Sequence, residues 1–279
     1  MRSDLAALAA LLSDRIGLAV DEGKHQAIEM RLQPTVAAAG LPNVSELVHR
    51  LSKGGDPALL DRTIDAMVTC ETLFFRDRKP FEALRATVLP RLREARRAER
   101  RIRIWSAACA TGQEPYSLAM LIDEQQREFA GWRVEIVASD VSAAAVAAAR
   151  EGRYSQFEVQ RGLPTPLLLR HFQRDGEAWR INDHLRAHVE FRRANLIDEF
   201  GRFGRFDIVF CRNVLMYMDV ERRRDILQRL SRVLADDGYL ALGAAETVVG
   251  ISDEFEPAPD CAGLFRRKTP ASLRMAANS

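Results

Sequence analysis

The sequence predicts an α/β fold, in which a mostly parallel sheet carries helices on both faces and follows a small helical unit. From Arg101 onward, apolar segments of strand length alternate with helical segments, and this alternation is typical of a parallel sheet. Residues 1 to about 70, by contrast, show no strand pattern. A turn of small residues follows the first predicted strand and an acidic residue ends the second, which is how an open α/β sheet holds a nucleoside.

The N-terminal unit should consist of short helices, because polar residues that can cap a helix precede its apolar periodic segments. We expect helices at 3–14, 22–38, 44–53 and 57–70. The candidate caps are Asp21, Asn43 or Ser45, and Asp56. Pro34 interrupts the second segment, so that helix should kink or end early.

A basic segment connects this unit to the α/β part. Between Arg76 and Arg103 there are eleven Lys or Arg residues and four acidic ones, although the net charge of the whole chain is only +2. We expect a basic linker helix over 76–101. Such a charge run is most often a solvated helix face; the alternative is a surface that attracts an acidic partner, either nucleic acid or protein.

The α/β part alternates strands and helices up to the last apolar segment. We expect strands at 102–107, 133–138, 188–192, 206–210, 238–243 and 263–268, and helices at 113–129, 142–149 and 219–235. The interval from about Arg150 to His188 is too long for a simple crossover. Because it contains a turn at Gly176 and an apolar segment at 179–181, it predicts an inserted helix and β-hairpin. Insertions at this edge of a sheet usually contact a substrate or partner.

These elements predict how the chain is divided into domains. We expect a helical N-terminal domain at 1–75, a linker helix at 76–101, a third domain at 102–269 with a β-subdomain inserted at about 152–188, and a disordered tail at 270–279.

The composition is that of an ordinary globular protein, with 47% hydrophobic residues. The apolar run at 5–12 follows Asp4 and fits an amphipathic helix better than a signal peptide. No stretch reaches the ~20 apolar residues of a membrane span. The four cysteines are far apart in the sequence, which favours reduced thiols. We therefore expect a cytoplasmic protein.

The turn after the first strand predicts an adenosine-containing cofactor. Small side chains that let a ligand approach the backbone lie at Ala107, Ala108, Ala110 and Gly112. Asp140 ends the second strand, where a carboxylate can accept hydrogen bonds from both ribose hydroxyls. Only Gly112 is a glycine, whereas a dinucleotide fingerprint has three. The sequence therefore disfavours NAD and a nucleotide-linked dehydrogenase.

Three motifs occur in order along the chain. They are Thr72-Leu-Phe-Phe-Arg-Asp77, Cys109-Ala-Thr-Gly-Gln-Glu-Pro-Tyr-Ser117 and Cys211-Arg-Asn-Val-Leu-Met-Tyr217. Together they resemble the CheR-type chemotaxis receptor methyltransferases, which use S-adenosylmethionine to methylate glutamate side chains on chemoreceptors. The resemblance covers most of the chain. It implies a Rossmann-like S-adenosylmethionine-dependent methyltransferase sheet with a small all-helical N-terminal domain and an inserted small β-subdomain.

The resemblance also implies an activity and roles for residues. The enzyme would be a protein-glutamate O-methyltransferase that releases S-adenosylhomocysteine and works beside membrane receptor arrays. The cofactor would contact Thr72, Arg76, Ala107, Glu114, Asp140, Asn195, Leu196, Arg212 and Asn213. Asp140 would hold the ribose, and at 195–196 a backbone amide or an amide side chain would read the adenine edge. The expected catalytic residues are Arg76, Arg212 and Tyr217.

Three of these residues have a plainer explanation. Glu114 can cap a helix start, and Asp140 can cap the helix that begins at Ser142. Tyr217 can simply fill the core.

The expected chemistry needs neither a metal nor a covalent nucleophile, because the sulfonium cofactor supplies the methyl group. A glutamate side chain has an ordinary pKa of about 4.3 and is already a carboxylate at neutral pH, so no general base is needed. One oxygen needs a hydrogen-bond donor, which can be Arg76, Arg212 or the Tyr217 hydroxyl. We expect one arginine to serve the cofactor and the other the substrate. The histidines predict no metal site, since His184 and His188 lack Glu or Cys partners at metal-ligand spacing.

The basic N-terminal half predicts docking to an acidic helical bundle of a chemoreceptor. The residues concerned are Lys24, Arg31, Arg62 and the segment 76–103. The turn at 171–181 is short, so we expect no dependence on a tether to a receptor's C-terminal peptide.

Two alternatives have less support in the sequence. A nucleic-acid methyltransferase would use the same cofactor, but the segment after Cys211 lacks the prolines typical of base-directed enzymes, and the basic segment lacks interleaved aromatics. We therefore expect no nucleic acid and no membrane insertion. The other alternative is a receptor-binding adaptor with a vestigial pocket.

Overall fold

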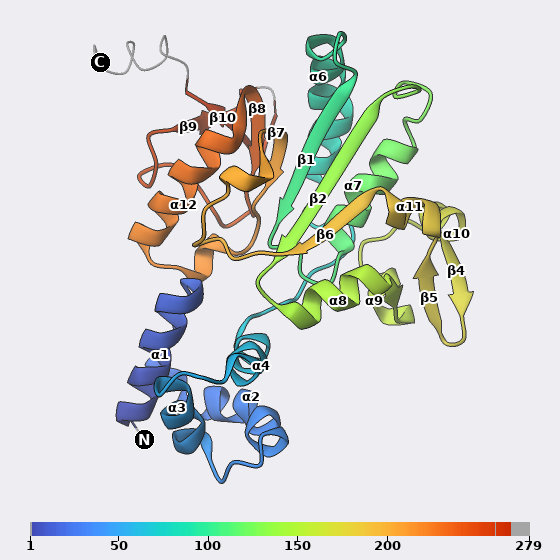
Figure 1. Ribbon diagram of the computed structural model, residues 1–279. Helices are drawn as coiled ribbons and strands as arrows, with labels where there is room; N and C mark the ends of the chain where they lie inside the picture. Colours follow the sequence, from blue (N-terminus) through green and yellow to red (C-terminus); the bar gives the residue numbers. More distant parts are fainter. Residues whose placement is uncertain (1, 260, 269–279) are drawn as a thin grey trace.

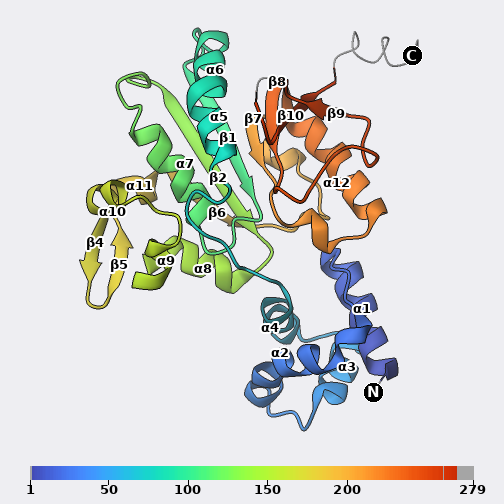
Figure 2. The same ribbon diagram turned by 180° about the vertical axis from the view of Figure 1, so that it is seen from behind.

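The structure is a computed structural model that describes residues 2–259 and 261–268 (Figures 1 and 2). An α/β part forms most of the molecule, and the N-terminal helices lie beyond one end of its main sheet. The tail expected at 270–279 lies outside the described residues. Within the described ranges, no helix is long and apolar enough to cross a membrane, and no disulfide joins the four cysteines.

The N-terminal helices begin close to their predicted positions. They are α1 (Arg2–Ile16), the 3-10 turn η1 (Glu22–Lys24), α2 (His25–Ala38), α3 (Val44–Ser52) and α4 (Pro57–Met67). Side-chain oxygens of Asp21, Asn43 and Asp56 accept hydrogen bonds from backbone N–H groups at the starts of η1, α3 and α4. The cap of α3 is therefore Asn43 and not Ser45. The helices share one core, made mainly of leucine, isoleucine and valine side chains.

Helix α2 continues through Pro34 to Ala38, so it does not end early at the proline. A proline inside a helix removes one backbone hydrogen bond and crowds the preceding turn. The same stretch of α2 buries Leu32, Thr35 and Val36. Because most of the stability of a short helix comes from packing, this burial maintains the helix across the lost bond.

The main sheet has seven strands in the order β6-β2-β1-β7-β8-β10-β9. They are β1 (Arg101–Ala107), β2 (Arg133–Asp140), β6 (Val189–Arg193), β7 (Phe206–Phe210), β8 (Leu234–Ala241), β9 (Phe255–Pro257) and β10 (Leu264–Arg267). Neighbours from β6 to β8 are parallel, whereas β10 is antiparallel to β8 and β9. The chain builds outward from β1 to β6 and then returns to the other side of β1. Ligands of open α/β sheets bind beside such a reversal, at the carboxyl ends of the strands.

The basic segment is helical over 79–95 and not over the predicted 76–101, and it is not one uniform helix. It contains α5 (Lys79–Ala83), a π-helical turn η2 (Leu84–Val88) and α6 (Leu89–Ala95). Pro90 has no N–H to donate, and the helix widens into the π turn just before it. The apolar face of the segment packs on the sheet through Phe81, Leu84 and Leu92.

Some of the positive charge of this segment is neutralised inside the fold. Arg96 binds Asp207 at 2.8 Å, and Arg101 and Arg103 bind Glu135 on β2 at 2.9 and 3.0 Å. These ion pairs hold the segment to the sheet. The charge count of the sequence therefore overstates the positive surface that a partner can meet.

Alternate residues of the strands face two separate cores. Ile102 and Ile104 of β1 face one core, and Trp105 and Ala107 face the other. The first core is covered by the helices from α5 to α8, and the second by α12 (Val220–Val233). Among the covering helices, α7 spans Gln113–Asp123 and α8 spans Ala143–Glu151.

Three predicted boundaries in this part are wrong: the ends of α7 and α12, and the start of β8, which lies at Leu234 and not at 238. Helix α7 ends at Asp123 and not at 129, because the polar residues that follow offer no continuous apolar face and fold into turns. Helix α12 ends at Val233, and the chain passes directly into β8 at Leu234. The short strand β9 was not predicted.

A second, three-stranded antiparallel sheet lies between α8 and β6, in the order β3-β5-β4. The elements of this interval are β3 (Arg153–Tyr154), α9 (Gln156–Gln160), α10 (Thr165–His171), β4 (Phe172–Asp175), β5 (Ala178–Ile181) and α11 (Asp183–Ala187). The predicted hairpin is β4–β5, which turns at Gly176. Strand β3 and the additional helices were not predicted.

Candidate active site

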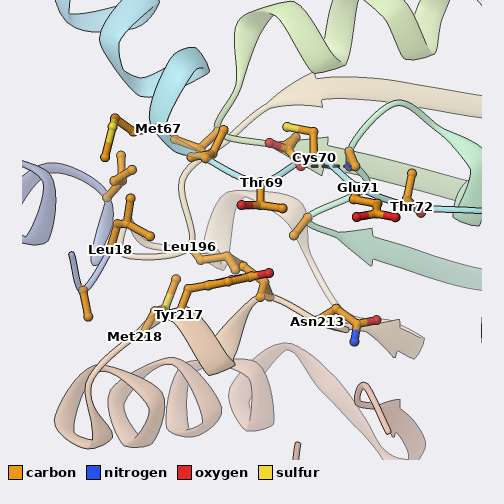
Figure 3. Close-up of a pocket in the computed structure, with 18 of the residues that line it drawn as sticks. Leu18, Met67, Thr69, Cys70, Glu71, Thr72, Leu196, Asn213, Tyr217 and Met218 are labelled. Carbon is orange, nitrogen blue, oxygen red and sulfur yellow. Dashed lines mark hydrogen bonds between the residues drawn. The ribbon is translucent and has the colours of Figure 1, made fainter. Parts of the chain in front are cut away.

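A cavity of about 390 Å³ opens at the carboxyl ends of the strands, beside the reversal of strand order. Its sheet wall consists of lining residues within 108–114, 140–141, 194–196 and 212–218, and its helical wall of lining residues within 16–31 and 67–68. The segment 69–76 joins the two walls. Figure 3 shows Thr69 to Thr72 on one side of the cavity and Asn213, Tyr217 and Met218 on the other. The volume is that of a small-ligand site.

Nine of the ten predicted site residues line this cavity. They are Thr72, Arg76, Glu114, Asp140, Asn195, Leu196, Arg212, Asn213 and Tyr217. The exception is Ala107, which is fully buried in the core that faces α12. Side chains alternate along a strand, so the last residue of β1 faces the core. Ala108 and Ala110, in the turn that follows, line the cavity instead.

The turn after β1 folds its backbone toward the cavity. Ala108, Ala110 and Gly112 have positive φ angles of 76°, 48° and 97°, which is uncommon for alanine. A Cβ on Gly112 would lie 3.0 Å from Ala149 Cβ and from Tyr154 Oη, so only glycine fits there without rearrangement. Small side chains on a strained turn leave the backbone open to a ligand.

Asp140 supports this turn with both carboxylate oxygens. Oδ2 accepts from the Ala110 N–H and Oδ1 from the Ser142 N–H, each at 2.9 Å. Burial raises the pKa of Asp140, and the backbone hydrogen bonds oppose that shift. The cap of α8 is Ser142 and not Asp140. Because the carboxylate has four lone pairs in all, Asp140 retains acceptor capacity toward the cavity.

Glu114 and Arg212 form a buried ion pair at the sheet wall. Arg212 Nη1 donates to Glu114 Oε2 at 3.0 Å, and Ser106 Oγ donates to Glu114 Oε1 at 2.7 Å. Burial raises the pKa of Glu114, and the charge of Arg212 opposes the shift. Arg212 Nη2 also donates to Asp77 Oδ2 at 2.6 Å and to the Arg76 carbonyl at 2.9 Å. Most of the guanidinium is therefore engaged by the protein, which favours a positioning role over direct donation to a substrate.

The segment that carries Thr72 and Arg76 is fixed by its two phenylalanines. Phe74 is fully buried and packs edge-on against Tyr154 at 5.1 Å between ring centroids. The Phe75 N–H donates to Ser117 Oγ on α7 at 3.0 Å. Arg76 lies between these anchors and Arg212 and lines the cavity. Within the described part of the chain, its Nη1 donates to the Glu71 carbonyl at 3.0 Å.

Asn195 joins the loop after β6 to the helical unit. Its Nδ2 donates to the Arg15 carbonyl at 2.7 Å, and its Oδ1 accepts from the Ile197 N–H at 3.3 Å. With the side chain engaged in this way, the structure favours a backbone amide of 195–196 as the group that would read an adenine edge.

A carboxylate that the sequence analysis missed organises the loop after β7. Glu246 accepts from the backbone N–H groups of Asn213, Val214 and Met216, at 2.7, 3.0 and 3.1 Å. It also accepts from Gly243 N–H at 2.7 Å. Asn213 has a positive φ of 57°, so these bonds hold a strained turn. The only sequence signal was an acidic residue shortly after the end of a predicted strand.

The same loop presents Tyr217 to the cavity from the 3-10 turn η4 (Leu215–Tyr217). The side chain extends into the cavity (Figure 3), and the residue is 37% exposed, so it is not core filler. Its carbonyl accepts from the Ala19 N–H of the helical unit at 2.8 Å.

Cys70 also lines the cavity. Burial, assisted by the charge of Asp140, raises the pKa of its thiol to about 11. It is therefore a neutral thiol at pH 7 and a poor nucleophile.

Nearly the whole chain is similar to known proteins. Residues 70–262 match the family model described as CheR methyltransferase, SAM binding domain, and residues 3–68 match that described as CheR methyltransferase, all-alpha domain. The chain is 40% identical to chemotaxis protein methyltransferase 1 of Pseudomonas aeruginosa, over 95% of this chain and 97% of that one. It is 38% identical to chemotaxis protein methyltransferase Cher2 of Pseudomonas putida, over 91% and 93% of the two chains.

Proposed function

The chain belongs to the CheR methyltransferase family, and on that premise we propose that it methylates glutamate carboxylates of bacterial chemoreceptors with S-adenosylmethionine. The products are glutamate methyl esters and S-adenosylhomocysteine, and the enzyme works at receptor arrays during adaptation. The observation that carries this proposal is the cavity at the strand reversal, which gathers Asp140, Arg76 and Tyr217.

The residues of the cavity fit an adenosyl group. The Asp140 carboxylate retains acceptor capacity for ribose hydroxyls, and the turn at 108–112 lets a nucleoside approach the backbone. The backbone at 195–196 would meet the base, and Thr72 and Arg76 the methionyl end. When bound, the cofactor supplies an electrophilic methyl group on its sulfonium.

The chain's own residues bind and align the two reactants. Arg76 or the Tyr217 hydroxyl donates to one oxygen of the substrate carboxylate, and the other oxygen keeps a lone pair for attack. A carboxylate with a pKa of about 4.3 is already ionised at neutral pH, so no residue needs to remove a proton. Arg212 fixes the backbone of Arg76 and the side chain of Asp77 instead of clamping the substrate. Alignment of this kind can contribute about 7–11 kcal/mol in favourable cases.

The helical wall is the part that we expect to meet the receptor. Lys24 and Arg31 line the cavity on this wall and are exposed, as is Arg62 on α4. An acidic helical bundle would be attracted to these charges, whereas much of the charge near 96–103 is already paired. The KM for receptor should therefore rise several-fold between about 0.05 and 0.3 M salt. A KM independent of salt would contradict electrostatic docking. A receptor-tail tether is not part of this proposal.

The proposal is tested with labelled S-adenosylmethionine and membranes that contain chemoreceptors. We expect the label to enter receptor protein and to leave as methanol in alkali, because a methyl ester is base-labile. Label that survives alkali, or that enters nucleic acid, would contradict the proposal.

A further inference from the structure

A cluster of potential metal ligands lies outside the active-site cavity, where α7 meets α10 and α11 (Figure 1). Asp123 ends α7, His171 ends α10, and His184 lies in α11. One ligand atom from each residue lies within 4.8 Å of the other two. The cluster joins the main sheet's helix layer to the inserted three-stranded sheet, and the cavity lining contains none of its members.

His171 is the unusual member of this cluster. It is 0% exposed, and neither of its ring nitrogens finds a hydrogen-bond partner among residues 2–259 and 261–268. Buried polar groups are nearly always bonded, and a neutral imidazole has one donor and one acceptor to satisfy. The ring therefore requires a partner that the described protein atoms do not supply.

The other two members are arranged so that one oxygen of Asp123 faces the histidines. Oδ2 accepts from Arg170 Nη2 at 3.3 Å, and Oδ1 lies 3.8 Å from His184 Nε2. Arg170 thus holds the carboxylate by one oxygen and leaves the other directed toward the cluster. A contact between His184 and Asp123 alone leaves both ring nitrogens of His171 without a partner among the described residues.

The three potential ligand atoms lie only slightly farther apart than the ligands of a bound metal ion. With metal–ligand distances near 2.1 Å, tetrahedral ligands lie about 3.4 Å apart. The three donor atoms, which lie within 4.8 Å of one another, must therefore approach by up to about 1.4 Å to bind one ion. His184 can supply this movement by side-chain rotation, since its side chain is 51% exposed.

We propose that Asp123, His171 and His184 bind one divalent transition-metal ion, with Zn²⁺ as the best match and water as the remaining ligand. Imidazole nitrogen and carboxylate oxygen are both ligands that Zn²⁺ accepts. The ion has a structural role: it fixes α10 and α11 to the end of α7.

The test uses the full chain without a polyhistidine tag, stripped of metal with a chelator and then titrated with Co²⁺ or Zn²⁺. We expect one Co²⁺ per chain, with the visible absorption of tetrahedral Co²⁺, and its displacement by Zn²⁺. At a Zn²⁺ concentration about 100-fold above Kd, Tm should rise by about 5 °C. Absence of bound Co²⁺ would overturn the proposal.

Variants separate this site from binding elsewhere on the surface. His184→Ala and Asp123→Asn should each weaken Co²⁺ binding at least tenfold, and His184 is exposed enough for the variant to fold. His188→Ala is the matched control, because His188 is exposed and lies just beyond α11; it should bind as the parent does. Equal binding by the parent and His184→Ala, or equal losses in His184→Ala and His188→Ala, would overturn the proposal.

Discussion

The two walls of the active-site cavity are built in different ways. In the sheet wall, Glu114, Asp140 and Arg212 are each at most 8% exposed, and each makes two or more hydrogen bonds. The helical unit is attached through separate polar contacts, such as those of Asp61 with Arg193 and Asp65 with Ser142. Under the proposed function, the sheet wall would fix the cofactor and the reacting atoms, and the helical wall would meet the partner. Substitutions in the sheet wall should therefore lower activity or stability much more than substitutions at the contacts of the helical unit.

The largest effect should come from Arg212→Met. Removing one partner of a buried ion pair leaves Glu114 and Asp77 uncompensated and typically costs about 3–5 kcal/mol. Turnover should fall at least ~100-fold, because the segment that carries Arg76 loses its anchor. Urea unfolding and a single-turnover methyl-transfer assay measure the two effects.

The double variant Arg212→Met with Glu114→Gln sharpens this test. It no longer buries an unpaired carboxylate at position 114, so part of the lost stability should return while activity does not. If Arg212→Met alone were as stable and active as the parent, the ion pair would have no role in holding the sheet wall.

Asp140→Ala should have the next largest effect, on cofactor affinity. Unsatisfied ribose hydroxyls cost about 1–3 kcal/mol, which is about 5- to 150-fold in Kd for S-adenosylhomocysteine. Isothermal titration calorimetry measures this change. Asp65→Ala is the control from the helical unit, because Asp65 accepts from Ser142 Oγ but does not line the cavity. Its Kd should stay within about twofold of the parent, and equal affinities for all three proteins would rule out the ribose role.

Glu246→Gln should affect catalysis more than binding. An amide in place of the carboxylate loses an acceptor and presents N–H groups to backbone donors, so the turn at 213–217 loosens. We expect kcat to fall about tenfold while the Kd for S-adenosylhomocysteine changes little. Glu256→Gln, at a partly exposed pair with Arg266, serves as the control and should leave kcat unchanged. An unaltered kcat in Glu246→Gln would show that the loop does not depend on this carboxylate.

The smallest effect should come from Arg193→Ala, at the contact with the helical unit. Both side chains of the Arg193–Asp61 pair are partly exposed, and such pairs contribute about 1 kcal/mol or less. The hydrogen bond from Arg193 lowers the pKa of Asp61. The contribution is therefore present at pH 7 and is lost as the pH falls below the ordinary aspartate pKa of about 3.9. Urea unfolding of the parent and of Arg193→Ala at several pH values tests this. If the two proteins differed by several kcal/mol in free energy of unfolding at pH 7, the helical unit would not be the more weakly attached part.

Local patterns predicted the strands and turns well but not the contacts between distant segments. The apolar run at 206–210 matches β7, and the caps Asp21 and Asp56 were recognised, because each depends on neighbouring residues. Glu246 was missed because its role depends on β8 lying beside β7. Two other contacts could not be predicted for the same reason. Arg212 donates to Asp77, 135 positions away in the sequence, and Asn195 donates to the carbonyl of Arg15. Motifs indicated which residues gather at the site, whereas the fold decides which of their donors remain available.

A crystal structure of the chain with S-adenosylhomocysteine tests the central claim most directly. We predict both ribose hydroxyls within hydrogen-bond distance of the Asp140 carboxylate, with the sulfur facing the space between Arg76 and Tyr217. A ligand bound away from Asp140, or a sulfur directed into the core, would contradict the account.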